Sequence, residues 1–212
     1  MRGSLTKVKV CGIMDHRELD IALSAGADAV GFVVEVEGSR HSISSQNARK
    51  LVLQVPIFVK SVAVIAPQSI GMAESLARKT GADIIQIHGS LEPENIAILK
   101  NKICQRLIVA INSESQETHG FDLIADAILL DTLNNGKLGG TGKTHDWNMS
   151  AELVERLKVP VILAGGLNPN NVVEAVRKVR PYAVDVSSGV ETDGRKDPEK
   201  INSFIREAKN CH

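Results

Sequence analysis

The segment Val8-Lys9-Val10-Cys11-Gly12-Ile13 is a short, mostly apolar run that ends in a thiol followed by a glycine. A second segment, Leu129-Leu130-Asp131-Thr132, has the same form but ends in a carboxylic acid. Short apolar runs bounded by glycine or polar residues are typical of buried strands. In a barrel of parallel strands, the side chains at the C-terminal strand ends face the active site. The two segments therefore predict a thiol and a carboxyl group, a possible base and acid, at one end of a barrel.

The rest of the chain repeats this unit of a strand followed by a helix. Strands that alternate with helices predict a parallel sheet. Eight strands favour a closed (β/α)8 or TIM barrel, and an open, doubly wound sheet is the alternative. The predicted strands cover residues 8–11, 29–34, 58–64, 84–87, 107–111, 127–130, 161–164 and 183–186.

Helix caps, prolines and glycines mark the predicted helices. Ser44 caps one helix, Asn168 a second with Pro169 at its first position, and Asp197 a third. The segment 112–125 is polar and weakly periodic, so the helix after the fifth strand is expected to be short or missing. The other predicted helices cover residues 17–25, 44–55, 68–80, 93–100 and 151–157.

Length and composition predict one cytoplasmic domain. The 212 residues are 43% hydrophobic, enough for one sizeable core, which we assign to residues 5–210. Lys and Arg together equal Asp and Glu, so net charge gives no reason to expect nucleic-acid binding. No apolar run approaches the ~18 residues of a membrane span, and no secretory signal is visible. Three cysteines without metal-type spacing indicate reduced thiols.

Two glycine-rich turns predict a phosphate site. Gly165-Gly166 follows the seventh strand and Ser188-Gly189 the eighth. Barrels commonly bind phosphate through the loops after these two strands and the N-terminus of a short helix. The alternative is a pair of tight turns that bind nothing. A third glycine-rich segment, residues 139–143, lacks the spacing of a nucleotide-binding loop and is predicted to be a lid.

Motifs along nearly the whole chain resemble phosphoribosylanthranilate isomerases. The resemblance implies a (β/α)8 barrel that converts N-(5-phosphoribosyl)anthranilate to 1-(2-carboxyphenylamino)-1-deoxyribulose 5-phosphate in tryptophan biosynthesis. It implies an Amadori rearrangement with a small phosphorylated substrate, no cofactor and no metal, in a monomer or homodimer. The motifs that carry it are residues 9–13, 26–32, 86–89, 129–132, 139–144, 164–169 and 184–190.

The resemblance also implies roles for single residues. Asp131 would be the general acid that opens the sugar ring, and Cys11 the base that removes the C2 proton. Arg40 would hold the anthranilate carboxylate, where His41 replaces the aromatic residue usual in the family. Taken alone, Cys11 could be a small core residue, Asp131 a turn residue and Arg40 a solvated side chain. His88, single after the fourth strand, is expected in a core or supporting role more than a catalytic one.

Strand alternation predicts a buried ion pair beside the thiol. Lys9 and Cys11 are two residues apart on the first strand, so both side chains point into the barrel. Asp185 lies on the eighth strand, which neighbours the first when the barrel closes. We therefore expect Lys9 and Asp185 to pair, the alternative being that one of them points outward.

Other enzymes and binding proteins with this fold remain as alternatives. Indole-glycerol phosphate synthases rely on lysines at several strand ends, and the fifth predicted strand has none. Metal-dependent epimerases need paired histidines and aspartates, whereas the strand ends supply only His88. A bifunctional sugar isomerase with two aspartates would lack the motif around Cys11. A non-catalytic sugar-phosphate sensor would keep the phosphate turns without needing Cys11 or Asp131.

Overall fold

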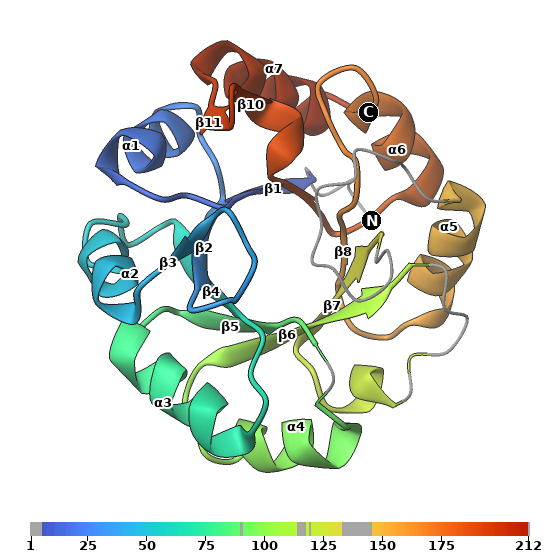
Figure 1. Ribbon diagram of the computed structural model, residues 1–212. Helices are drawn as coiled ribbons and strands as arrows, with labels where there is room; N and C mark the ends of the chain where they lie inside the picture. The colour runs from blue at the N-terminus through green and yellow to red at the C-terminus, as the bar shows by residue number, and fades with distance from the viewer. Residues whose placement is uncertain (1–5, 90, 114–117, 119, 133–145, 212) are drawn as a thin grey trace.

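Eight parallel strands form a closed barrel in the computed structural model, which describes residues 6–89, 91–113, 118, 120–132 and 146–211 (Figure 1). This confirms the predicted (β/α)8 architecture. The strands follow the ring order β1-β9-β8-β7-β6-β5-β4-β2, and β2 pairs with β1 to close the ring. The barrel strands are β1 Lys7–Cys11, β2 Ala29–Val34, β4 Lys60–Ile65, β5 Ile84–Ile87, β6 Arg106–Asn112, β7 Ala127–Asp131, β8 Val161–Leu163 and β9 Ala183–Val186.

Helices cover the outside of the barrel (Figure 1). Their ends lie where the sequence supplies caps: the Ser44 hydroxyl accepts the N–H of Asn47, and Gly81 ends α3 in the left-handed conformation. The Asp197 carboxylate likewise caps α7, as predicted. The α-helices of the described residues are α1 His16–Ser24, α2 Ser45–Val52, α3 Ile70–Thr80, α4 Pro93–Lys100, α5 Trp147–Arg156, α6 Val172–Val179 and α7 Pro198–Lys209.

Short elements complete the connections between strands and helices. Between β6 and β7 the described residues form only the 3-10 helix η1, Phe121–Leu123, where the sequence predicts a short or missing helix. Without a regular apolar stripe, this polar segment has little to pack against the barrel. The other short elements are β3 Ser42–Ile43, η2 Ser188–Val190, β10 Glu191–Thr192 and β11 Arg195–Lys196.

Two predicted element boundaries are wrong for local reasons. The strand expected from residue 58 begins at Lys60, because Pro56 starts a turn in which the carbonyl of Pro56 accepts the N–H of Val59. Phe58 in that turn is 95% exposed. The helix expected over residues 151–157 begins earlier, at Trp147, because the Asp146 side chain caps it.

The helix expected to start at Pro169 begins instead at Val172. The Asn168 carboxamide accepts the N–H of Asn170, and the Asn171 carboxamide accepts the N–H of Asn168. Such local side-chain to backbone bonds compete with helix formation. Asn168 therefore closes a tight turn, and Asn171 occupies the cap position of α6.

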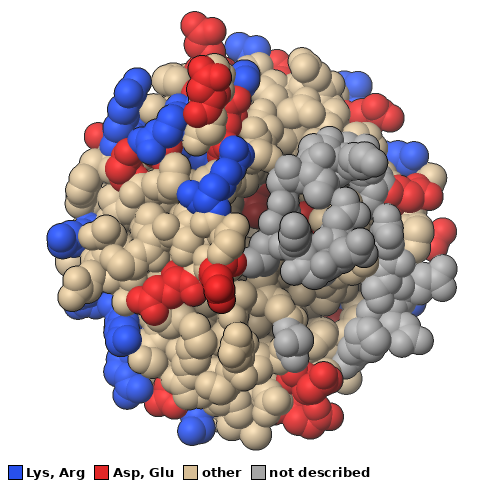
Figure 2. Space-filling view, viewed as in Figure 1, with Lys and Arg blue, Asp and Glu red and all other residues tan. Residues whose placement is uncertain are grey.

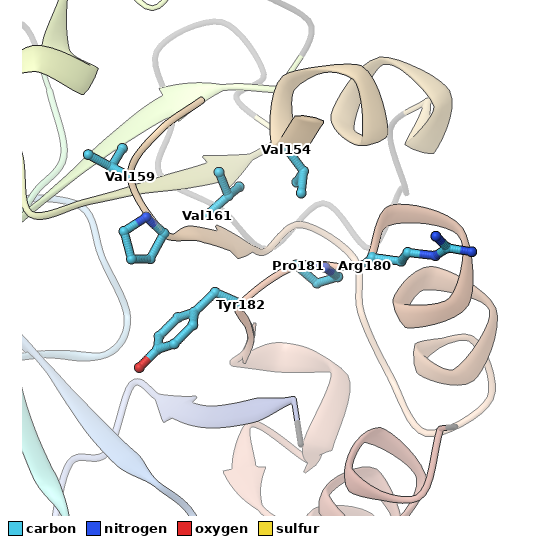
Figure 3. A pocket seen from close by; sticks show the side chains of 7 residues that line it. Val154, Val159, Val161, Arg180, Pro181 and Tyr182 are labelled. Atoms are coloured by element: carbon cyan, nitrogen blue, oxygen red, sulfur yellow. The ribbon is translucent and has the colours of Figure 1, made fainter. Parts of the chain in front are cut away.

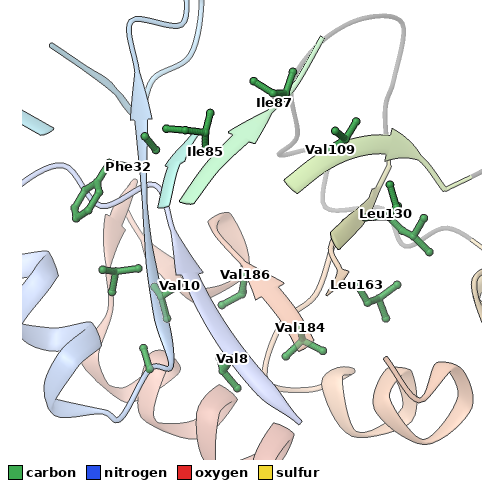
Figure 4. Close-up of a cluster of buried hydrophobic side chains, with 14 of the residues drawn as sticks. Val8, Val10, Phe32, Ile85, Ile87, Val109, Leu130, Leu163, Val184 and Val186 are labelled. Atoms are coloured by element: carbon green, nitrogen blue, oxygen red, sulfur yellow. The ribbon is translucent and has the colours of Figure 1, made fainter. Parts of the chain in front are cut away.

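Alternation along the strands separates an outer core from the barrel interior. Val8 and Val10 of β1 belong to the same buried cluster as Leu19 of α1 and Phe204 of α7 (Figure 4). The inner positions of β6, β7, β8 and β9 form a smaller apolar cluster: Ile108, Ala110, Ala127, Leu129, Ile162, Ala164 and Ala183. The next inward positions towards the C-terminal ends of β7 and β9 carry polar groups.

The surface carries mixed charge. On the face shown in Figure 2, the acidic and basic side chains of the described residues are interspersed. Across the described ranges, no helix is both long enough and apolar enough to cross a membrane.

Candidate active site

Cys11 and Asp131 are the last residues of β1 and β7. Because all barrel strands are parallel, the two side chains lie at the same end of the barrel. Both are buried, with 7% of Cys11 and 8% of Asp131 exposed. The structure therefore places the predicted thiol and carboxyl group at one mouth, as strand-end side chains.

Glycines on the neighbouring strands make room for both groups. A Cβ atom at Gly31 would lie 2.7 Å from the Cys11 Sγ atom, so a larger residue there would require the thiol to move. A Cβ atom at Gly165 would lie 3.2 Å from Oδ1 of Asp131 and 2.3 Å from the Thr132 hydroxyl. The thiol thus packs over β2, and the turn after β8 packs against the acid.

The environment of Asp131 favours its protonated form. Burial and the negative charge of Asp185 raise its pKa from the ordinary value of 3.8 to about 6. Two influences oppose this rise: the Thr132 N–H donated to Oδ1 at 2.7 Å and the positive charge of Lys9 both stabilise the ionised form. With a pKa of about 6, roughly a tenth of the molecules still hold this proton at pH 7, and a general acid requires such a proton.

The environment of Cys11 contains opposing influences. Burial raises the pKa of the thiol above its ordinary value, whereas the positive charge of Lys9 lowers it. Lys196 lowers it further and Asp185 raises it. The net direction is upward, so the thiol form predominates before a substrate binds.

Lys9 and Asp185 form the predicted ion pair inside the barrel. They face each other in the β1–β9 register, and Nζ of Lys9 lies 2.9 Å from Oδ2 of Asp185. Only 4% and 10% of the two side chains are exposed. Burial would lower the pKa of Lys9, but Asp185 and Cys11 raise it above its ordinary value, so the side chain is an ammonium ion.

The two predicted phosphate turns touch each other. Gly165 and Gly166 have positive φ angles of 83° and 66°, which glycine adopts readily. Ser188 opens the short helix η2 directly after β9. A Cβ atom at Gly189 would lie 1.9 Å from the carbonyl oxygen of Leu167, so the two turns are in contact. All four predicted phosphate residues are thus brought to the C-terminal ends of β8 and β9.

Arg40 reaches this end of the barrel but contacts a carboxylate of the protein. Its Nη2 atom lies 2.5 Å from Oε2 of Glu191, while 59% of its side chain is exposed. Oε1 of Glu191 accepts from His41 at 2.9 Å and from Lys196 at 2.7 Å. Although burial opposes it, the hydrogen bond to His41 and the charge of Lys196 lower the pKa of Glu191 to about 2. The loop after β2 is therefore tied to the segment after η2.

His88 lies inside the barrel rather than on its surface. Its side chain is buried, and its Nε2 atom lies 2.6 Å from the amide nitrogen of Gln86. Burial and the charge of Lys9 lower the pKa of His88 to about 3, so the ring is neutral. Gln86 was missed in the sequence, although its spacing of two residues from His88 places both on one face.

Glu191 and Lys196 were also missed. Glu191 directly follows the second phosphate turn, so proximity to that turn was an available signal. Its contact with His41, however, spans 150 residues of sequence. The lid predicted at residues 139–143 lies outside the described residues.

A cavity of about 340 Å³ lies at the other end of the barrel (Figure 3). It is formed at the beginnings of β8 and β9, whereas Cys11 and Asp131 lie at strand ends. It is therefore separate from the candidate site. Its lining residues are Val154, Val159, Pro160, Val161, Arg180, Pro181 and Tyr182.

Comparisons with known proteins identify the family of the chain. A family model described as N-(5'-phosphoribosyl)anthranilate (PRA) isomerase matches residues 8–207. The N-(5'-phosphoribosyl)anthranilate isomerase of Methanothrix thermoacetophila is 52% identical over 207 residues, which cover 98% of this chain and 100% of the relative.

Solved structures extend the match to three dimensions. The phosphoribosyl anthranilate isomerase of Thermotoga maritima, described elsewhere as dimeric, has a TM-score of 0.85 and 35% identity. The alignment covers 97% of this chain and 99% of that one. A structure of such an isomerase in complex with reduced 1-(o-carboxyphenylamino)-1-deoxyribulose 5-phosphate has a TM-score of 0.81 and 32% identity, with the same coverage. The chain therefore belongs to the phosphoribosylanthranilate isomerase family.

Proposed function

We propose that Cys11 is the base and Asp131 the acid of this enzyme's reaction. The reaction is the isomerisation of N-(5'-phosphoribosyl)anthranilate to 1-(o-carboxyphenylamino)-1-deoxyribulose 5-phosphate in tryptophan biosynthesis. One observation carries the assignment: a buried thiol and a buried carboxyl group lie at the ends of β1 and β7, at the same mouth of the barrel.

Asp131 starts the reaction by opening the sugar ring. Its O–H donates a proton to the ring oxygen while the C1–O bond breaks. The lone pair of the anilino nitrogen forms a C=N bond, which leaves a cationic Schiff base and an Asp131 carboxylate. The raised pKa of Asp131, about 6, supports this role because the acid must hold a proton before the step.

Cys11 completes the rearrangement. Its thiolate removes the proton from C2, the C–H electrons form a C1=C2 double bond, and the nitrogen takes up the C=N electrons to give an enolamine. The C2 hydroxyl then loses its proton as C1 gains one, which gives the ketone product. The cationic Schiff base forms beside the thiol and favours its ionisation, as a nearby cation does. These steps use no cofactor and no metal ion.

The two ends of the substrate bind to different elements. The turns at Gly165-Gly166 and Ser188-Gly189 contact the phosphate through backbone N–H groups, and the start of η2 adds a favourable partial charge. Arg40 binds the anthranilate carboxylate. Its exposed guanidinium keeps donors free beyond the bond to Glu191, and its planar shape suits a bidentate contact.

Residues 5–210 act as one catalytic domain in the cytoplasm, on a small phosphorylated substrate and without nucleic-acid or membrane partners. Of the two predicted states, monomer and homodimer, we favour the homodimer. Ile57 and Phe58 are 85% and 95% exposed at the N-terminal end of the barrel. Exposed apolar side chains of this size support association with another protein surface.

The test of this assignment is the turnover of Cys11→Ala. Loss of a general base should lower kcat by roughly 10²–10⁴-fold, while KM and the circular dichroism spectrum change little. Cys104→Ala serves as the matched control, because Cys104 is exposed on the outer surface. A Cys11→Ala enzyme with nearly full kcat would assign the base elsewhere.

A further inference from the structure

The ion pair between Lys9 and Asp185 has no step in the mechanism above, yet it lies between the two catalytic groups. Around the barrel, the ring order β7-β8-β9-β1 places the strand of Asp185 beside the strand of Cys11 and two strands from that of Asp131. Lys9 precedes Cys11 by two residues on the same inward face of β1. The pair therefore lies within reach of both groups.

The lysine end of the pair packs against the catalytic sulfur. A Cβ atom at Gly31 would lie 3.0 Å from Cε of Lys9 and 2.7 Å from Sγ of Cys11. The end of the lysine side chain and the sulfur thus lie side by side over the same glycine of β2. Any larger residue at this position would push them apart.

The aspartate end of the pair is incompletely satisfied. Oδ2 of Asp185 accepts from Lys9, but the buried Oδ1 atom has no hydrogen-bond partner among the described residues. A buried carboxylate oxygen without a donor is costly for folding. The negative charge of Asp185 also raises the pKa of Asp131.

We propose that Lys9 and Asp185 are positioning residues that bias the two catalytic groups in opposite directions. The ammonium of Lys9 stabilises the Cys11 thiolate, and the carboxylate of Asp185 keeps Asp131 protonated. Within one ion pair, Lys9 thereby favours loss of the proton from the base, and Asp185 favours its retention by the acid. This inference rests on the proposed roles of Cys11 and Asp131.

The charged groups around the two sites support these directions. Against the effect of burial, the positive charge of Lys9 lowers the pKa of Cys11, and Lys196 of β11 contributes in the same direction. Asp185 raises the pKa of Cys11 and, after burial, is the main cause of the raised pKa of Asp131. Removing Lys9 should therefore raise the pKa of Cys11, and removing Asp185 should lower it.

The test titrates Cys11 without substrate, in a Cys104→Ser/Cys211→Ser background that leaves one reactive thiol. The rate of alkylation by iodoacetamide is measured against pH, and its midpoint gives the pKa of Cys11. Lys9→Met should raise this midpoint by about one pH unit, a tenfold loss of thiolate. Asp185→Asn, which keeps a hydrogen-bond acceptor for Lys9, should lower the midpoint.

A second readout follows Asp131. In Asp185→Asn, the acidic limb of the pH profile of kcat/KM should move to lower pH, because the charge that keeps Asp131 protonated is gone. Lys7→Met is the matched control on the same strand: Lys7 pairs with Asp28 at the surface, and both readouts should stay unchanged.

The opposite signs separate this proposal from a purely structural role. Shifts of the thiol midpoint in the same direction for both variants, or no shift in either, would overturn it. If Lys9→Met does not fold, the direction of the shift in Asp185→Asn decides alone. Failure of the proposed function would give a different result. Cys11→Ala would then turn over substrate at the normal rate, while the alkylation midpoints of Lys9→Met and Asp185→Asn would still shift in opposite directions.

Discussion

At the scale of single residues, the raised pKa of Asp131, which suits its proposed role as an acid, has a cost in stability. Its pKa of about 6 lies above the value of about 3.9 expected in the unfolded chain. The folded protein therefore binds this proton more tightly than the unfolded chain does. The resulting stabilisation is fully present below pH 4 and is lost as the pH rises through 6. Near neutral pH the buried, ionised form makes the fold less stable.

Asp131→Asn should therefore be inactive in ring opening but more stable than the wild type near neutral pH. Asparagine keeps the shape and an acceptor for the Thr132 N–H, but it has no proton to lose. Relative to wild type, its free energy of unfolding should rise by about 2 kcal/mol between pH 4.5 and pH 7.5. Urea denaturation at both pH values measures this, with the surface variant Glu152→Gln as the control. A constant difference would contradict the raised pKa of Asp131.

Single residues also show what the sequence could and could not predict. Cys11 and Asp131 were placed correctly because each ends a short apolar strand, and strand ends share one face of a parallel barrel. Lys9 and Asp185 followed from alternation and barrel closure. Glu191 was not predicted, because a carboxylate after a turn has no pattern that identifies partners 150 residues away. Contacts between loops that are distant in sequence leave no periodic pattern from which they could be predicted.

At the scale of elements, the proposed phosphate site is built on the contact between two turns. Gly189 approaches the carbonyl of Leu167 so closely that a Cβ atom would lie 1.9 Å from its oxygen. Because this oxygen belongs to the backbone, a side chain at position 189 would fit only if one of the two turns moved. The sequence predicted these turns but misplaced the start of α6, because the carboxamides of Asn168 and Asn171 bond to neighbouring backbone N–H groups and delay the helix.

Gly189→Ala should separate the turns and weaken phosphate binding. We expect the inhibition constant of inorganic phosphate, measured by competition with substrate, to rise at least about tenfold, the effect of losing one or two backbone contacts. Gly71→Ala in α3 is the control, because a Cβ atom there would meet nothing within 4 Å. Unchanged inhibition in Gly189→Ala would place the phosphate elsewhere.

The loop after β2 carries Arg40, the residue proposed to bind the anthranilate carboxylate. Glu191 holds Arg40 and His41 of this loop with one buried carboxylate. Its pKa of about 2 keeps it ionised at every pH suitable for an assay. Glu191→Gln removes the charge and leaves Arg40 less well held before the anthranilate carboxylate arrives.

We expect Glu191→Gln to raise KM about tenfold, the effect of one charge-assisted hydrogen bond, with a smaller change in kcat. Steady-state kinetics measures both values. Glu37→Gln, an exposed carboxylate in the same loop, should leave KM unchanged. An unaltered KM in Glu191→Gln would show that Arg40 needs no help from this carboxylate.

At the scale of the whole molecule, the barrel closes where its first and last strands meet. Lys9 on β1 and Asp185 on β9 are 176 residues apart in sequence and 2.9 Å apart in the structure. The pair is almost completely buried at this closure. Removing one partner of a buried ion pair leaves an uncompensated charge, which typically costs 3–5 kcal/mol. The closure of the barrel and the charge at the active site thus depend on the same two residues.

Lys9→Met should therefore lower the free energy of unfolding by about 3–5 kcal/mol, because it leaves Asp185 buried and unpaired. The double variant Lys9→Met/Asp185→Asn should recover part of this loss, since no charge then remains buried at the site. Chemical denaturation of the two single variants and the double variant completes the double-mutant cycle. Lys7→Met, two residues earlier on β1, breaks an exposed pair and should cost less than about 1 kcal/mol. Strictly additive single effects would mean that the ion pair does not stabilise the closure of the barrel.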